Sequence, residues 1–253
     1  FHSIGLVVVY RFVTTYYSYC DEIDYIAQSK IAIFGIGGVG SYVAEGLARC
    51  GIGEFILIDS DDISLTNINR QIHALETTIG QKKTLMMKER ILSINPQAKV
   101  TTIEKLYTPE SNFFNCDDDY TYIVDAVDDV KAKINLIVNA NKHNLPIMSS
   151  MGTANKLDPQ KFVITDIYKT HTCPLARIMR KTLKQQGIKK LKVLYSTEEP
   201  FTNYTVNFKE NTSKDNSPAS TRKQPLGSIS FVPPIAGLMI AGEIVKDICQ
   251  INR

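Results

Sequence analysis

The feature that most constrains this chain is a glycine-rich turn between an apolar run and a helical pattern. Residues 31–34 are apolar and end at Gly35, and residues 39–50 then carry apolar side chains at helical spacing. The turn reads Gly-Ile-Gly-Gly-Val-Gly-Ser, so its backbone can approach a phosphate while the helix directs its first amides at the negative charge. A nucleotide site is predicted here; the alternative is that the glycines serve only tight packing of the helix on a sheet.

Apolar runs and helical patterns alternate along the rest of the chain. Strands are expected at 31–34, 55–58, 99–103, 120–124, 146–148, 162–167 and 191–195, and helices at 39–50, 81–94, 130–141 and 174–186. Residues 229–251 predict a packed C-terminal helix, because charged side chains recur inside the apolar pattern. The fold class expected is α/β: a Rossmann-like, doubly wound, mostly parallel sheet with helices on both faces and a C-terminal extension.

The composition suits one folded unit of this size. Its 43% hydrophobic and 22% charged residues allow a buried core and disfavour intrinsic disorder. We expect an N-terminal segment over 1–29 and one domain over 30–253, with 151–253 as its substrate-side part. Polar residues dominate 196–228, which predicts a mobile surface loop.

Charge and cysteine content narrow the functional classes. A formal charge of +3 does not by itself imply nucleic-acid binding. The five cysteines are widely spaced and form no CxxC pair, which suits a reducing compartment and argues against a thiolate zinc site. We therefore expect a cytoplasmic protein. The apolar run 5–10 is too short to span a membrane, whereas peripheral membrane association or a tether upstream of Phe1 stays open.

A second polar set follows the strand predicted at 55–58. Asp59 stands at its end, where an acid suits a ribose hydroxyl. Further on, Arg70 offers a planar fork, Lys83 a compact charge and Asn67 a neutral hydrogen bond to phosphate oxygens. The set predicts a triphosphate site. The alternative is that Arg70 makes a surface ion pair with a nearby aspartate and Lys83 is merely solvated.

Three aspartates follow the strand predicted at 120–124, and the carboxyl ends of such strands line the ligand crevice. Asp128 is the stronger candidate to hold Mg²⁺ against phosphates, since hard cations take oxygen ligands. For the other two a structural role is equally expected: Asp129 would cap the next helix and Asp125 would satisfy loop amides.

These motifs resemble a known family. The stretches at 35–41, 57–71, 80–83 and 125–129 read GIGGVGS, LIDSDDISLTNINRQ, GQKK and DAVDD. They are similar to the adenylate-forming domain of ubiquitin-activating enzymes and of their ThiF-type bacterial relatives. Later segments, at 152–154, 174–177, 193–198 and 227–237, resemble the tRNA threonylcarbamoyladenosine dehydratase branch. The resemblance runs from about Lys30 to the C-terminus, and the combination of motifs is highly specific.

The resemblance implies an ATP-dependent dehydration, in which the threonylcarbamoyl side chain of a modified adenosine beside the tRNA anticodon closes into a ring through an adenylated carboxylate. Placement and charge neutralisation suffice for this chemistry, so no protein nucleophile is required. The implied cofactors are ATP and Mg²⁺, with a monovalent cation as a further candidate. The implied partners are tRNA rather than DNA, a second copy of the chain, and a cysteine desulfurase or sulfur-acceptor system.

Carried over position by position, the resemblance assigns the site. Arg70, Lys83 and Asp128 are the implied catalytic residues, Asp128 is the implied Mg²⁺ ligand, and Gln71 is expected to orient Arg70. The implied nucleotide-binding set is Gly35, Gly37, Gly38, Gly40, Asp59, Asn67, Arg70, Gln71, Lys83 and Asp128.

A basic stretch carries the expected contact with tRNA. It holds seven positive residues and no acidic one: Arg177, Arg180, Lys181, Lys184, Lys189, Lys190 and Lys192. Such a cluster can neutralise several phosphates, and binding through it should weaken with salt. The alternative is a solvated helix face.

Other functions stay open. Relatives carry an Arg-Phe-x-Arg pattern near the N-terminus, where this chain has Thr14 in the last position and Arg11 in the first. If the missing arginine is essential, the chain is a non-catalytic nucleotide-binding protein. An adenylyltransferase that activates the C-terminus of a ubiquitin-like sulfur carrier is the other rival, although the missing CxxC pair and the basic stretch count against it. A nicotinamide dehydrogenase would leave Asn67, Arg70 and Lys83 without a role.

Overall fold

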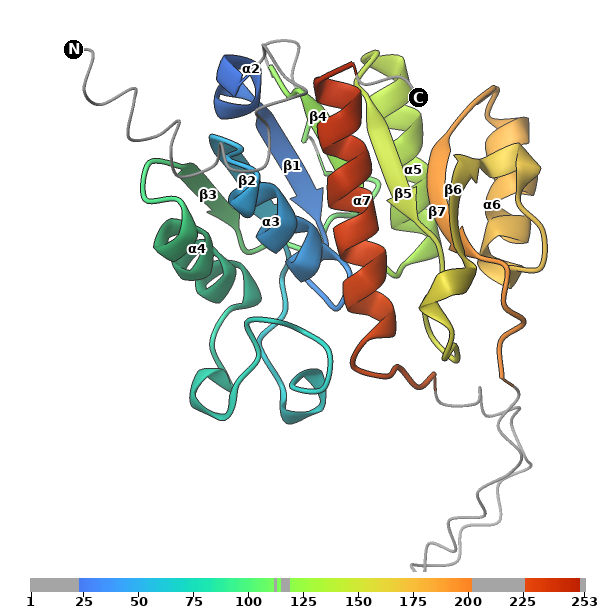
Figure 1. The fold of residues 1–253 in the computed structure, drawn as a ribbon. Coiled ribbons are helices and arrows are strands. Elements are labelled where there is room, and N and C mark those ends of the chain that lie inside the picture. The colour runs from blue at the N-terminus through green and yellow to red at the C-terminus, as the bar shows by residue number, and fades with distance from the viewer. Residues whose placement is uncertain (1–22, 112, 115–118, 202–225, 251–253) are drawn as a thin grey trace, which may run out of the picture.

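The computed structural model describes residues 23–111, 113–114, 119–201 and 226–250. Arg11 and Thr14 lie outside these residues, as does most of the segment 196–228 for which mobility was expected. The described elements form an α/β fold built on one sheet (Figure 1).

Seven strands make up this sheet, in the spatial order β3-β2-β1-β4-β5-β7-β6. They are β1 (Lys30–Phe34), β2 (Glu54–Ile58), β3 (Lys99–Ile103), β4 (Tyr122–Asp125), β5 (Ile147–Ser150), β6 (Phe162–Asp166) and β7 (Lys192–Ser196). All neighbours pair in parallel except β6, which runs antiparallel to β7 at the edge. The predicted mostly parallel sheet is therefore confirmed, and each strand lies within two residues of its predicted ends.

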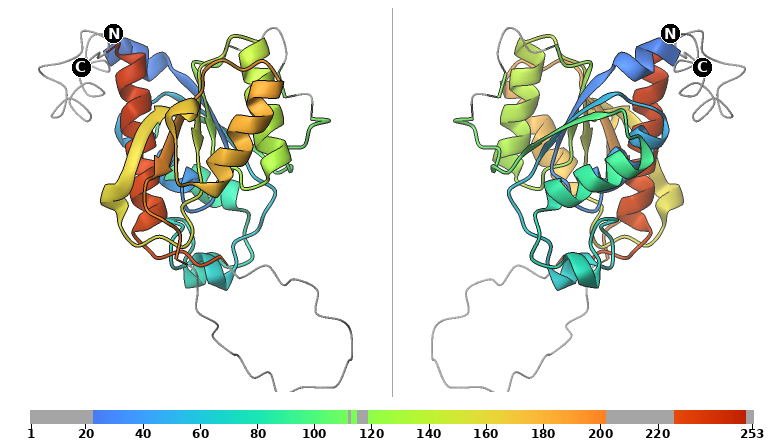
Figure 2. Two further views of the ribbon diagram at one scale, coloured as in Figure 1. Left: turned by 90° about the vertical axis from the view of Figure 1, so that its right-hand side faces the viewer. Right: turned by 90° about the vertical axis from the view of Figure 1, so that its left-hand side faces the viewer.

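Helices cover both faces of the sheet, as predicted. They are α2 (Ile23–Gln28), α3 (Gly40–Arg49), α4 (Lys83–Ile94), α5 (Val130–Lys142), α6 (Pro174–Gln185) and α7 (Val232–Ile248), with single 3₁₀ turns η1 (Leu65–Asn67), η2 (Glu76–Thr78), η3 (Pro159–Lys161) and η4 (Ile167–Lys169). Figure 2 shows α3 and α7 on one face and α5 and α6 on the other. Among the described helices, none is long and apolar enough to cross a membrane.

The inner strands read as continuous apolar runs because both of their faces are covered. The side chains of β1 beyond Lys30, and all of those of β4, are buried. On the α3 side, α7 packs closely through two glycines. A Cβ atom at Gly237 would clash with the carbonyl oxygen of Val39, and one at Gly46 would lie 2.8 Å from the Cβ of Ala241. The last helix therefore lies directly on the helix that follows the glycine turn.

The strand order reverses between β1 and β4, since β2 and β3 extend to one side and β5 onwards to the other. In open α/β sheets a ligand crevice forms at such a point, outside the carboxyl ends of the strands. The turns that follow β1, β2 and β4 carry the glycine motif, Asp59 and Asp128. The fold thus brings the residues predicted to bind the nucleotide to the side of the sheet at which the parallel strands have their carboxyl ends.

Candidate nucleotide-binding site

The glycine turn is shaped by two contacts that exclude side chains. Gly35 has a φ of +87°, and a Cβ atom there would lie 2.6 Å from the carbonyl oxygen of Ala126. A Cβ atom at Gly40 would meet the carbonyl oxygen of Gly35. Packing therefore explains Gly35 and Gly40. It does not explain Gly37, which is half-buried and whose nearest neighbour would be the Nε2 atom of Gln71 at 3.9 Å.

Asp59 ties the end of β2 to this turn. Its Oδ2 atom accepts a hydrogen bond from the Ile36 amide at 2.7 Å, and its Oδ1 atom accepts one from the Asp61 amide at 2.9 Å. Burial raises the pKa of the Asp59 carboxyl, while the Lys83 charge and the two amides pull that pKa down. The predicted ribose-binding acid is thus held in place beside the backbone predicted to approach the phosphates.

Lys83 is not solvated, so that alternative is wrong. The residue is only 6% exposed, and its Nζ atom lies 2.7 Å from the Oδ2 atom of Asp61. The neighbouring Lys82 pairs with Asp62, also at 2.7 Å. A buried ammonium next to Asp59 supplies a fixed positive charge at the edge of the crevice.

Arg70 does not form the alternative ion pair with Asp61 or Asp62. Its Nη1 atom donates to the carbonyl oxygen of Thr66 at 2.8 Å and to the Oδ1 atom of Asn69 at 2.9 Å. Its stem lies over the glycine turn, because a Cβ atom at Gly38 would be 3.3 Å from the Arg70 Cγ. The guanidinium has further donors besides those two hydrogen bonds, and these can serve an anion.

Asn67 stabilises the 3₁₀ turn η1, which precedes Arg70. It is buried, and its Oδ1 atom accepts a hydrogen bond from the Ser64 amide at 3.1 Å, which closes the capping box of η1. Gln71 is also buried, but the hydrogen bonds that hold Arg70 among the described residues come from Thr66 and Asn69. The expectation that Gln71 orients Arg70 therefore has no hydrogen bond to support it.

Several buried polar atoms near these elements lack a partner. In the described part of the chain, the buried side-chain atoms without one belong to Ser41 at the start of α3, to Gln71 near Gly37, and to His73 and Thr84 near Lys83. Buried polar groups are nearly always hydrogen-bonded, so such atoms call for water or a ligand. A polar ligand at the glycine turn fits this arrangement.

The turn after β4 rests on a buried ion pair that the sequence analysis missed. The Lys133 Nζ atom lies 2.9 Å from the Oδ2 atom of Asp125, both side chains are fully buried, and Ser149 donates to the same carboxylate. Lys133 also donates to the carbonyl oxygen of Val127 at 3.0 Å. Asp125 is thus a structural residue, as one reading expected.

The other two aspartates of this turn differ from each other. Asp129 caps α5, since its Oδ1 atom accepts from the Ala132 amide at 2.7 Å. Asp128 is exposed, and within the described residues no hydrogen bond or ion pair engages its carboxylate. An exposed carboxylate at this edge fits Mg²⁺, which keeps several waters and binds one or two protein oxygens together with phosphates. No cluster of three or more metal-binding side chains occurs among the residues that the structure describes.

The basic stretch divides into exposed and engaged residues. Arg180 donates to the carbonyl oxygen and hydroxyl of Thr170, and Lys192 forms ion pairs with Glu243 at 3.0 Å and Asp247 at 2.6 Å. Two carboxylates compensate the Lys192 charge, whereas Arg180 is held by neutral oxygens and keeps further donors. The assignment of these two residues to nucleic-acid binding stays a prediction. The exposed members are Arg177, Lys181, Lys184, Lys189 and Lys190.

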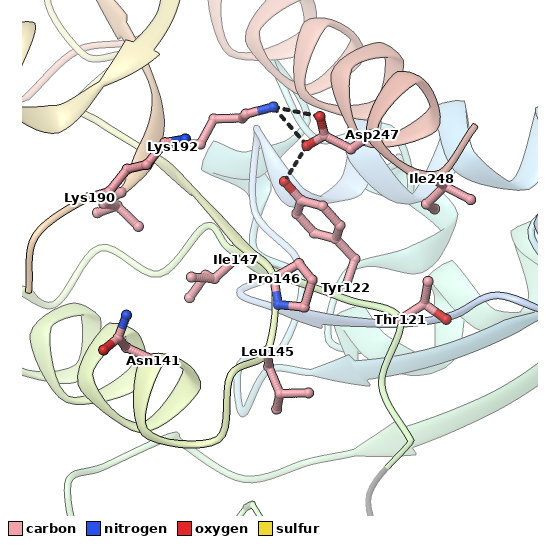
Figure 3. A pocket seen from close by; sticks show the side chains of 11 residues that line it. Thr121, Tyr122, Asn141, Leu145, Pro146, Ile147, Lys190, Lys192, Asp247 and Ile248 are labelled. Atoms are coloured by element: carbon pink, nitrogen blue, oxygen red, sulfur yellow. Dashed lines mark hydrogen bonds and ion pairs between the residues drawn. The ribbon is translucent and has the colours of Figure 1, made fainter. Parts of the chain in front are cut away.

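Lys192 also lines a cavity of about 590 Å³ at the opposite edge of the sheet (Figure 3). Tyr122, Ile147 and Lys192, the first residues of β4, β5 and β7, all line it. Tyr122 donates to Asp247 at 2.7 Å, and Lys192 holds the same carboxylate. The cavity therefore lies at the amino ends of the strands, whereas the glycine turn lies at the carboxyl ends.

Comparisons with known proteins agree with this geometry. A sequence model of the ThiF family matches residues 19–253. The tRNA threonylcarbamoyladenosine dehydratase of Bacillus subtilis (strain 168) is 41% identical over 231 residues, or 91% of this chain and 91% of that protein. Crystal structures of E. coli tRNA N6-threonylcarbamoyladenosine dehydratase, TcdA, in complex with ATP and with AMP cover 96% of this chain and 95% of theirs, at 31% identity and TM-scores of 0.82 and 0.81.

His73 predicts how stability depends on pH. The residue is 4% exposed, and burial, together with the Lys83 and Arg90 charges, lowers its pKa from 6.5 to about 4. Between these two values the unfolded chain binds a proton that the folded protein does not, so the free energy of unfolding should fall as the pH drops. Below pH 4, the protonation of His73 should have lowered the free energy of unfolding by about 3 kcal/mol relative to neutral pH.

Urea unfolding of the wild type and of His73→Gln from pH 7 to pH 4 measures this contribution. The variant has no titrating ring, so its stability should fall less over that range. His171→Gln, which alters an exposed histidine, is the matched control and should follow the wild type. Parallel curves for the wild type and His73→Gln would contradict the assignment.

Proposed function

The chain belongs to the ThiF family, and from that premise we propose that it is an ATP-dependent tRNA threonylcarbamoyladenosine dehydratase. The enzyme adenylates the carboxylate of the threonylcarbamoyl side chain and closes that side chain into a ring. The proposal rests on one observation: Asp59, Lys83 and Arg70 come together around the glycine turn. An enzyme that acts on tRNA must be in the compartment that contains tRNA, and we therefore propose a cytoplasmic location.

The reaction needs little covalent chemistry from the protein. A carboxylate oxygen of the substrate attacks the α-phosphorus of ATP, and pyrophosphate leaves. A ureido oxygen or nitrogen of the same side chain then attacks the activated carbonyl carbon, AMP leaves with the former carboxylate oxygen, and a proton is released. The net result is loss of one water from the side chain and conversion of ATP to AMP and pyrophosphate.

The residues of the site act by orientation and by charge. Asp59 holds the ribose, and the backbone at Gly37 and Gly38 approaches the phosphates. Lys83 and Arg70 neutralise the charge that builds up on phosphate oxygens in the transition state. Asp128 would hold Mg²⁺, which supplies further charge neutralisation at the phosphates.

The deciding experiment incubates the full chain with ATP, Mg²⁺ and tRNA that carries threonylcarbamoyladenosine. Mass analysis of the released nucleosides should show loss of one water, and the nucleotide product should be AMP. Arg70→Ala should slow turnover about 100- to 1,000-fold, because it removes charge compensation in the transition state. Lys82→Ala, which removes a cation already paired with Asp62, is the control and should keep most of the activity.

The outcomes separate the candidate functions. An unchanged tRNA mass, together with ATP-dependent adenylation of a carrier protein, would favour the sulfur-carrier adenylyltransferase. An unchanged mass with ATP bound and intact would favour a non-catalytic protein. Full turnover by Arg70→Ala would remove that residue from the mechanism.

We further propose that α6 contacts the tRNA. Arg177, Lys181 and Lys184 recur at helical spacing on its exposed face, and Lys189 and Lys190 follow on the loop that leads to β7. Phosphate contacts of this kind release counterions, so affinity falls steeply with salt.

Reversal of two of these charges tests the contact. Lys181→Glu with Lys184→Glu should weaken tRNA binding and lower the slope of log affinity against log salt by about one per lost contact, with ATP affinity unchanged. Lys99→Glu with Lys105→Glu makes the same change in net charge at exposed positions in and after β3, and should bind tRNA more tightly than the α6 variant. Equal losses in the two variants would assign the effect to net charge alone.

We also propose a homodimer, in line with the family resemblance. Four exposed apolar side chains, called the apolar patch below, stand in or beside η1, η2 and α4: Leu65 (63% exposed), Leu75 (55%), Ile79 (41%) and Leu85 (39%). Backbone hydrogen bonds between residue 63 and residues 80 and 81 bring its segments together. Exposed apolar patches of this kind mark protein interfaces.

Sedimentation should therefore give twice the 28.3 kDa mass of the chain. Leu65→Glu with Ile79→Glu should yield monomers, because it places charges in the patch. Leu106→Glu changes a leucine that is 65% exposed outside the patch and should leave the dimer intact. A monomeric wild type at micromolar concentration would contradict the proposal.

A further inference from the structure

Two phenylalanine rings are exposed in the described part of the chain. They belong to Phe201, which is 52% exposed, and Phe231, which is 42% exposed, whereas the other described phenylalanines are buried or half-buried. The ring contacts found among the described residues involve neither of them. Phenylalanine is normally a buried residue, so two exposed rings in one region of the surface indicate a binding surface.

Phe201 stands near the phosphate side of the nucleotide site. Its amide donates to the carbonyl oxygen of Asn155 at 2.9 Å, and the Asn155 side chain accepts from the Gly227 amide at 2.9 Å. The next residue, Ser228, accepts through its carbonyl oxygen from Asn69, in the loop after β2, at 2.8 Å. Figure 1 shows the chain beyond β7 and the start of α7 on the side of the sheet where the parallel strands have their carboxyl ends.

Phe231 stands beside the glycine turn. It is the N-cap residue of α7, and Pro233 of the same helix lies against Gly38, where a Cβ atom would be 3.0 Å from the Pro233 Cβ. Ser228, which Asn69 binds, precedes it by three residues. Both exposed rings therefore lie in segments that border the crevice predicted to bind the nucleotide.

The proposed substrate brings unpaired bases to this place. The carboxylate of the modified adenosine has to meet the α-phosphate at the glycine turn, so the neighbouring nucleotides of the anticodon loop must lie at the border of the crevice. Proteins bind the unpaired bases of RNA loops by stacking them on aromatic side chains. An adenosine that is drawn out of its stack also leaves its neighbours without a stacking partner.

We propose that Phe201 and Phe231 stack against unpaired bases next to the modified adenosine in the anticodon loop. The inference rests on the proposed function and adds a second kind of contact to it. The positive residues of α6 bind phosphates, whereas these rings bind base faces. Because every base has such a face, the two rings accept anticodon loops of different sequence.

The affinity of the full chain for threonylcarbamoyladenosine-containing tRNA, measured over a range of salt concentrations, tests the stacking. Phe201→Ala and Phe231→Ala should each weaken binding about fivefold or more. The slope of log affinity against log salt should stay that of the wild type, because no phosphate contact is lost. Phe201→Leu keeps an apolar side chain without a ring face and should lose nearly as much as Phe201→Ala, whereas Phe201→Trp should bind at least as tightly as the wild type.

Tyr25→Ala is the matched control. This tyrosine is 66% exposed, but it lies in α2, which precedes β1 and so stands at the amino end of that strand. Its removal should leave the affinity for tRNA unchanged. Thermal unfolding of all variants shows whether they are folded.

Fluorescence supplies a measurement that does not depend on the alanine variants. The chain contains no tryptophan, so Phe201→Trp and Phe231→Trp each introduce a single indole. Stacking against a base should quench the indole fluorescence when this tRNA is added. ATP alone should leave the fluorescence unchanged in both variants.

The outcomes distinguish this inference from the function on which it rests. A wild type that forms the cyclic product, together with alanine variants of wild-type affinity and tryptophan variants that tRNA does not quench, would overturn the stacking alone. Quenching of Phe231→Trp by ATP alone would assign that ring to the nucleotide site, and alanine variants that become monomers while the wild type is a dimer would assign the rings to a contact between copies. Either result contradicts the proposal. A wild type that neither binds this tRNA nor converts it would overturn the proposed function as well.

Discussion

Two backbone turns meet where Gly35 approaches the carbonyl oxygen of Ala126, and no side chain fits between them. This contact sets the distance between the turn after β1 and the turn after β4, which carry the glycine motif and Asp128. The Ile36 amide, next to Gly35, is bound by Asp59 from the end of β2. One glycine position therefore fixes the relative placement of the three turns that form the crevice.

The cations at the carboxyl ends of the strands differ in how far neighbouring carboxylates compensate their charge. Lys133 is fully buried with Asp125 and stabilises the turn, because a buried carboxylate without a partner would be costly. Lys83 is buried but reaches Asp61, whose own side chain is exposed. Arg70 is held by neutral oxygens, so its charge is not neutralised by a neighbouring carboxylate. Charge compensation thus falls from the sheet interior outwards, and the least compensated cation lies over the glycine turn.

Most of the fold was predictable because its signals are local: apolar runs mark the strands, and glycines and aspartates mark their ends. The candidate site residues could be proposed for the same reason, since they stand in the segments that follow β1, β2 and β4. Ion pairs between residues distant in sequence could not be predicted in this way. Lys192 looked like one more residue of a basic stretch, but α7 brings Glu243 and Asp247 to it. The burial of Lys133 could have been predicted, because it is the one lysine among the positions of α5 that face the core.

The helix that covers the glycine turn, α7, is made after all the other described elements. Pro233, at the start of α7, lies against Gly38, since a Cβ atom at Gly38 would be 3.0 Å from the Pro233 Cβ. Gly237 then packs on the backbone of α3. During synthesis the first strand, turn and helix leave the ribosome long before their cover exists, and contacts so far apart in sequence form late. We infer that the nascent protein gains a complete nucleotide crevice only when α7 has emerged, so a truncated product would keep the binding motif without its binding site.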